Sequence, residues 1–198
     1  MTKLLKINGL VLISLIPAFV LVWRLLTDNL GANPVEFLTH STGDWTVYFL
    51  LLTLAISPLQ NRFKLNWNKL YLPAHLMRRI LGLAAFTYAL LHLSTYFVFD
   101  MSLSIDDAIT DIIDRPFILI GMLSFVLLFA LAITSNAWSQ RVMKKNWRTL
   151  HKAIYALTFL GILHYALLVK ADFLWPIIYM LGFAILMLMR MRFNNRKA

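Results

Sequence analysis

Hydrophobic residues lie along the chain in six long runs that are separated by short polar segments. These runs cover residues 7–26, 45–59, 80–99, 117–134, 153–169 and 173–189. A helix crosses the hydrocarbon core of a bilayer with about 20 apolar residues, and flanking aromatic and basic residues extend several runs into the interface. The second run is short for a crossing. The pattern predicts an all-α fold, a polytopic membrane bundle of about six transmembrane helices.

The composition agrees with a protein that lies within the bilayer. Of the 198 residues, 60% are hydrophobic and 14% are charged, and the mean hydropathy is +0.71. A soluble domain of this size does not need so much apolar surface for its core, so the surplus must face the lipid bilayer. No internal repeat and no flexible linker divides the chain. We therefore expect one domain over residues 1–198.

The charged residues are sorted along the chain, which has a formal net charge of +10. All nine acidic residues lie in alternate polar segments, and of the 19 basic residues only Arg24, Arg115 and Lys170 accompany them. The other basic residues occupy the remaining segments: Lys3, Lys6, Arg62, Lys64, Lys69, Arg78, Arg79, Arg141, Lys144, Lys145, Arg148, Lys152, Arg190, Arg192, Arg196 and Lys197. Basic loops stay in the cytoplasm, so both termini are expected to be cytoplasmic. This sorting indicates membrane orientation, and no nucleic acid is expected as a partner.

Cysteine is missing from the chain, and acidic residues are missing from the six apolar runs. The chain has no cysteine, which excludes a disulfide framework, a zinc–thiolate site and covalent haem attachment through CxxCH. Any haem must therefore be bound non-covalently. None of the six runs contains Asp or Glu, which disfavours a proton-coupled transporter or an ion channel.

Two histidines lie inside the runs, where ionisable side chains are costly and commonly functional. His92 lies seven residues before the end of the third run, and His164 lies five before the end of the fifth. These two helices would be parallel, so the imidazoles would lie at similar depth in the outer half of the membrane. Imidazole is the usual axial ligand of non-covalent haem. Two could hold one iron from both sides, which suits electron transfer; the alternative is that each makes a structural hydrogen bond.

The other histidines are weaker candidates. His151 lies 13 residues before His164, or roughly 20 Å of helix rise, at the cytoplasmic start of the fifth run, where it could hold a second haem. An ideal helix would turn the two rings roughly 140° apart, so this arrangement would need a kink; a structural role at the interface is the alternative. His75, in a polar loop, and His40, in an outer loop, are expected to be structural.

Two adjacent arginines open the third run. The ordinary interpretation is that Arg78 and Arg79 anchor the helix at the cytoplasmic face. Arg78 is also 14 residues before His92, close to a whole number of helical turns. Its guanidinium could therefore point toward the same interior seam and meet a haem propionate or a flavin phosphate.

Several stretches of the chain are similar, in order, to one known family: GANPVEFLTHSTGDW, RRILGLAAFTYALLHLSTYFVFD, DRPFILIGM, LAITSN and WRTLHKAIYALTFLGILHYALLVK. Together they resemble the MsrQ family, formerly YedZ, whose members are haem-binding membrane subunits of bacterial methionine sulfoxide reductase systems. The likeness covers nearly the whole chain. More distantly, the chain is similar to the ferric-reductase-like transmembrane domain that NADPH oxidases and STEAP reductases share.

The resemblance implies a multi-pass, b-type haem protein of the bacterial inner membrane that takes part in protein repair. It would carry electrons to MsrP, a periplasmic molybdoenzyme that reduces methionine sulfoxide in proteins, so the reductase active site would lie on that partner. The family's haem histidines match His92, His151 and His164, which would bind the iron of one haem b or two. Its paired arginines, associated with FMN, match Arg78 and Arg79.

The electron donor is expected to be a separate molecule. Oxidases of the wider family carry a large C-terminal flavin and nucleotide domain after the last span, whereas this chain ends at Ala198. Membrane quinol or a soluble cytoplasmic flavin reductase would then supply the electrons, and the acidic outer loops could help to dock the acceptor. Two alternatives stay open, namely a ferric or quinone reductase of the same fold, and a non-redox membrane anchor or transporter.

Overall fold

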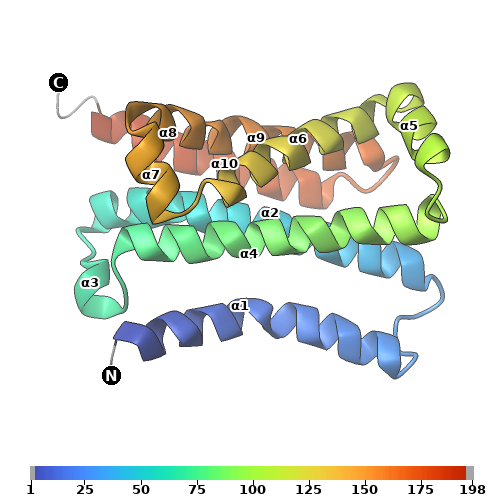
Figure 1. The fold of residues 1–198 in the computed structure, drawn as a ribbon, viewed down its shortest axis with the longest axis horizontal. Helices are drawn as coiled ribbons and strands as arrows, with labels where there is room; N and C mark the ends of the chain where they lie inside the picture. Colours follow the sequence, from blue (N-terminus) through green and yellow to red (C-terminus); the bar gives the residue numbers. More distant parts are fainter. Residues whose placement is uncertain (1–2, 195–198) are drawn as a thin grey trace. The chain divides into compact units, whose positions relative to one another are not determined.

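The computed structural model describes residues 3–194 and is helical throughout, with no strand among these residues (Figure 1). Six of its helical segments are long and apolar enough to cross a membrane. They are Lys3–Leu26, Pro34–Phe63, Ala74–Asp100, Pro116–Ile133, Lys145–Leu168 and Leu174–Met191. The predicted all-α, multi-pass membrane fold is confirmed. Arg196 and Lys197, which contributed to the expected orientation, lie outside the described residues.

The chain forms two compact units, Met1–Ile105 and Asp106–Ala198. The first contains α1 (Lys3–Leu26), α2 (Pro34–Phe63), α3 (Trp67–Leu70), α4 (Ala74–Thr95) and a π-helical turn, η1 (Tyr96–Asp100). The second contains α5 (Ile105–Asp114, which begins at the boundary), α6 (Pro116–Ile133), α7 (Ala137–Met143), α8 (Lys145–His151), α9 (Ala153–Leu168) and α10 (Leu174–Asn194). That residues 1–198 act as one domain stays a prediction.

The spanning helix α2 is longer than the apolar run that predicted it. It begins after Asn33, whose side-chain oxygen accepts the backbone N–H of Glu36 at 3.3 Å. Residues 34–44 are mostly polar, but the buried Thr42 hydroxyl bonds within the helix, where its Oγ1 donates to the Leu38 carbonyl at 2.7 Å. Such back-bonding satisfies a hydroxyl without solvent. The helix therefore extends through a polar segment that hydropathy alone placed outside the span.

Several residues that the sequence placed in polar loops lie in helices. His40 belongs to α2 and His75 to the first turn of α4, so both loop placements were wrong. Asp44 also belongs to α2, so the expectation that no spanning helix carries an acidic residue was wrong as well. The cause is the same in each case, because helices extend past the apolar runs at their polar ends.

The core of the first unit lies where α2 packs on α4 and α1 joins them. Leu50 and Leu54 of α2 and Ala85 and Tyr88 of α4 are all buried in the unit where these two helices pack. Tyr88 also reaches α1, where its hydroxyl donates to the Ser14 carbonyl at 2.9 Å. A small side chain such as Ala85 lets helix backbones approach closely, as is usual in membrane bundles.

In the second unit, α9 packs between α6 and α10 (Figure 1). Leu157 and Ile162 of α9 and Tyr179 of α10 are fully buried there. Large apolar side chains such as Leu123 of α6 and Leu181 of α10 are instead exposed on the outer faces of their helices. Apolar surface of this kind faces lipid in a spanning helix, so the surplus hydrophobic residues have a physical explanation.

Candidate functional site

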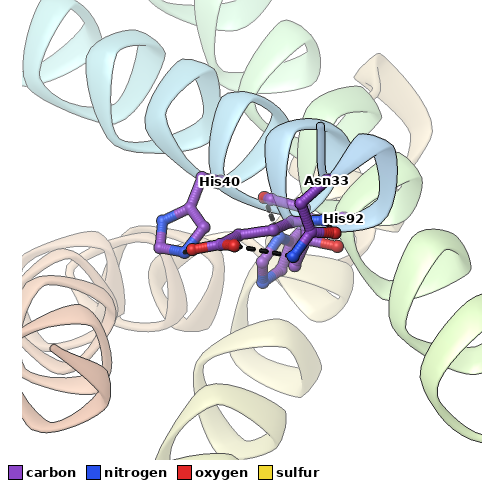
Figure 2. Close-up of polar contacts among 5 residues, drawn as sticks. Asn33, His40 and His92 are labelled. Atoms are coloured by element: carbon purple, nitrogen blue, oxygen red, sulfur yellow. Dashed lines mark hydrogen bonds and ion pairs between the residues drawn. The ribbon is translucent and has the colours of Figure 1, made fainter. Parts of the chain in front are cut away.

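The imidazole of His92 lies against the first turns of α2. Its Nδ1 is 2.9 Å from the Thr39 carbonyl oxygen and 3.5 Å from the Thr42 hydroxyl oxygen. Figure 2 shows the ring below this part of α2. The ring also lies beside Gly43, where an added Cβ would be 3.3 Å from both Nδ1 and Cε1. α2 therefore determines the position of this histidine.

His164 of α9 is held in the same way by α6. Its Nδ1 is 2.6 Å from the Phe117 carbonyl oxygen, and the Phe117 ring lies beside it with the ring centroids 6.0 Å apart. An added Cβ at Gly121 would be only 2.7 Å from His164 Nδ1 and 2.8 Å from Cε1. The imidazole thus lies directly on the backbone of α6.

These contacts define the proton position of both rings. A carbonyl oxygen only accepts hydrogen bonds, so Nδ1 of His92 and of His164 must carry the hydrogen. In a neutral imidazole the lone pair is then on Nε2, the nitrogen that binds metals in this arrangement. A carbonyl bonded to the other ring nitrogen is also the usual support of a metal-binding histidine. The residues present therefore fit axial ligation of a haem iron.

His151 is held by a different set of contacts. The Thr134 hydroxyl donates to the Ala130 carbonyl at 2.7 Å and is 3.1 Å from His151 Nε2. Since the hydroxyl hydrogen is already used, Nε2–H is the donor to Thr134 and the lone pair lies on Nδ1. Trp147 stacks on the ring, with centroids 3.9 Å apart, and donates to the Thr134 carbonyl at 2.8 Å. Ligation through Nε2 would require His151 to give up its bond to Thr134.

The helix is interrupted beside this histidine. α8 ends at His151 and α9 begins at Ala153, so the expected fifth span is not one regular helix from His151 to His164. Lys152, between α8 and α9, keeps right-handed helical dihedrals (φ −72°, ψ −19°), so the break is a local irregularity within one span.

The paired arginines lie at the start of α4, and both side chains are exposed. Arg78 Nη1 donates to the Ser57 hydroxyl of α2, which is also the helix that the His92 imidazole contacts. Arg78 and His92 therefore both contact α2; that their side chains share one interior seam stays a prediction. Arg78 and His92 are about 21 Å apart along α4, so they lie toward opposite ends of this helix.

His40 contacts a carboxylate at the surface of α2. Its Nε2 is 4.0 Å from Glu36 Oε1, and Asn33 Nδ2 donates to the other oxygen of Glu36 at 2.8 Å (Figure 2). Within residues 3–194 no cluster of three or more histidine or acidic side chains could hold a metal ion by itself. Haem differs from a bare ion because its macrocycle supplies four of the iron ligands and the protein supplies one or two.

Sequence reasoning missed the two glycines on which the rings lie. Gly43 and Gly121 stand inside spanning helices, where glycine costs roughly 1 kcal/mol relative to alanine. For Gly121, which lies inside the fourth run, that cost was the available signal, whereas Gly43 lies before the second run. The cost does not tell which residue of another helix needs the space.

Known proteins are similar to this chain in sequence. Residues 42–162 match the family described as the ferric reductase like transmembrane component, so the fold and the match define a protein of that class. The protein-methionine-sulfoxide reductase heme-binding subunit MsrQ of Herminiimonas arsenicoxydans is 46% identical over 180 residues, which cover 89% of this chain and 80% of that protein. The chain belongs to the MsrQ family.

Two other relatives of the same name agree with this assignment. The protein from Azospira oryzae is 44% identical over 181 residues, covering 90% of this chain and 75% of its own length. The protein from Brucella anthropi is 41% identical over 174 residues, covering 88% and 76%. The resemblance inferred from the sequence motifs is confirmed.

Proposed function

We propose that the chain is a haem b-binding electron-transfer subunit of a protein-methionine-sulfoxide reductase system, in which His92 and His164 would hold the haem iron. The observation that carries this proposal is the pair of Nδ1 contacts to helix carbonyls, 2.9 Å at Thr39 and 2.6 Å at Phe117. Both place the lone pair on Nε2. The names of the relatives, which describe heme-binding subunits, support the same conclusion. His151 is the candidate for a second haem.

The distribution of basic and acidic residues between the loops supports a direction of electron transfer across the membrane. Basic loops mark the cytoplasmic face, so we infer a bacterial inner-membrane protein with both termini in the cytoplasm. Bound haem supplies a one-electron carrier inside the bilayer. The donor would be membrane quinol or a cytoplasmic flavin reductase, and the acceptor would be the periplasmic molybdoenzyme MsrP. On this proposal the chain holds no reductase active site of its own.

The proposal is tested by the absorbance spectrum of the detergent-purified protein, oxidised and then reduced with dithionite. Two imidazole ligands give low-spin haem, so we expect a Soret band that shifts on reduction and sharp α and β bands. Pyridine haemochrome quantification then decides whether His151 holds a second haem. A colourless protein from cells supplied with haem precursor would contradict the proposal and favour an anchor or transporter.

FMN binding at the start of α4 gives a separate prediction. Replacing Arg78 and Arg79 together with alanine should lower the flavin content of the purified protein and leave haem unchanged, because the arginines lie about 21 Å along α4 from His92. Each charged hydrogen bond to a phosphate is worth about 1.5–3 kcal/mol, so the flavin affinity should fall at least tenfold.

The matched control removes two other basic residues from the first unit, Arg62 at the end of α2 and Lys69 of α3, both of which are exposed. This double alanine variant should keep its flavin. Flavin is measured by fluorescence after denaturation and haem by its Soret band. Equal flavin in the two double variants would refute a specific role for Arg78 and Arg79.

A further inference from the structure

The same three-part contact occurs in both units of the protein. In each, a histidine of one helix lies on a glycine of its neighbour, and Nδ1 donates to the carbonyl four residues before that glycine. His92 lies on Gly43 and bonds to Thr39, whereas His164 lies on Gly121 and bonds to Phe117. The repeated spacing indicates one physical requirement that is met twice.

Helix geometry explains why the glycine must stand at that spacing. The carbonyl of residue i already accepts the backbone N–H of residue i+4 inside the helix. A second donor must therefore approach from the side, and side chains tilt toward the N-terminus, so that the side chain at i+4 covers this approach. Glycine at i+4 leaves the carbonyl accessible to an imidazole.

The two glycines differ in how closely the ring approaches them. A Cβ at Gly121 would lie 2.7 Å from His164 Nδ1, 2.8 Å from Cε1 and 3.2 Å from Cγ, so the ring would have to leave its position. A Cβ at Gly43 would lie 3.3 Å from the nearest atoms of His92, so the ring would have to move by only a few tenths of an ångström. The effect of adding a methyl group should therefore be larger at Gly121.

Other helical glycines in the same helices lack this contact. Gly161 lies in α9 with His164, and a Cβ there would meet nothing within 4 Å. Gly82 lies in α4 with His92, and a Cβ there would meet only the Thr53 methyl group at 4.0 Å. These two positions separate the cost of losing a histidine contact from the general effect of alanine in a spanning helix.

We propose that Gly43 and Gly121 are positioning residues, which let the two imidazoles hydrogen bond to a helix carbonyl and thereby set the ring orientation and the donor strength of Nε2. This inference rests on the proposed role of His92 and His164 as haem ligands. A hydrogen bond from Nδ1 makes the imidazole a stronger ligand and stabilises ferric over ferrous iron. Loss of either contact should therefore raise the midpoint potential.

The experiment compares Gly121→Ala with Gly161→Ala, and Gly43→Ala with Gly82→Ala, in the full-length haem-loaded protein. Haem content, midpoint potential and the low-spin electron paramagnetic resonance signal, which reports imidazole orientation, are measured for each. Support of a ligand by neighbouring groups is typically worth 10–100-fold in metal affinity, so Gly121→Ala should lose haem about tenfold or more relative to Gly161→Ala. Gly43→Ala should keep its haem, with a raised potential and shifted g-values.

The inference is overturned if Gly121→Ala matches Gly161→Ala in haem content, potential and g-values. It is also overturned if Gly43→Ala matches Gly82→Ala, a result that stands even if Gly121→Ala cannot be purified. His164→Ala and His92→Ala separate this failure from failure of the proposed function. If both retain full haem, the ligand assignment is wrong; if both lose it while the glycine variants behave as their controls, only the positioning role is wrong.

Discussion

His164→Ala and His92→Ala are each expected to remove most of the bound haem while the helices stay inserted. Changing groups that merely support a ligand typically costs 10–100-fold in metal affinity, so loss of the ligand itself should cost at least about tenfold. The spectrum of any remaining haem should change from low-spin to high-spin, because one axial imidazole is gone. Haem per protein is measured by pyridine haemochrome, and insertion by far-ultraviolet circular dichroism in detergent.

The matched control for His92→Ala is His75→Ala, since His75 lies in the first turn of the same helix and is exposed. For His164, a glutamine variant tests the effect of the cavity, because glutamine fills part of the space and can still donate to Phe117 but is a poor iron ligand. His75→Ala should keep its haem, and His164→Gln should lose it. A full haem complement in both His92→Ala and His164→Ala would show that the ligand assignment is wrong.

Truncation of Tyr88 is expected to give a large loss of stability. Its hydroxyl accepts the Ala18 N–H at 2.9 Å and donates to the Ser14 carbonyl at 2.9 Å. In an unbroken helix the Ala18 N–H would donate to the Ser14 carbonyl. The Tyr88 hydroxyl therefore lies between these two groups in the hydrogen-bond ladder of α1, beside Pro17. Because an inserted side chain or a proline interrupts a helix, the hydroxyl replaces the bond that α1 gives up there.

We expect Tyr88→Ala to lower the free energy of unfolding by about 3–5 kcal/mol, the usual cost of truncating a buried aromatic ring. Tyr88→Phe keeps the ring and loses only the two hydrogen bonds, which in membrane proteins are worth about 0.6 kcal/mol each on average, so its loss should be about 1 kcal/mol. Unfolding in detergent can be followed by tryptophan fluorescence, since the chain has six tryptophans and no cysteine for a thiol dye.

The control for Tyr88→Phe is Tyr155→Phe. Tyr155 lies under the Arg190 guanidinium, 4.9 Å from its ring centroid, a contact that phenylalanine keeps. Its unfolding free energy should change by less than about 0.5 kcal/mol. If Tyr88→Phe were as stable as this control, the inserted hydroxyl would contribute nothing to the stability of the fold.

Local pattern predicted the spanning helices well and their polar ends poorly. Apolar runs identified all six spans, because a bilayer crossing depends on a local count of hydrophobic residues. The start of α2 was missed because Thr42 and its neighbours read as loop residues, although the Thr42 hydroxyl bonds back to its own helix. His40 and Asp44 were misplaced for this reason, and His75 was misplaced because α4 also begins before its apolar run.

The sequence by itself determined the class of fold, the two intramembrane histidines and the family, because each follows from residue type and order along the chain. Only the tertiary structure decided which backbone carbonyl each imidazole contacts and why Gly43 and Gly121 are glycines. These contacts join residues far apart in the chain, 53 positions for His92 and Thr39 and 47 for His164 and Phe117. They depend on how two helices pack against each other, and a local sequence pattern does not show which distant residues this packing brings together.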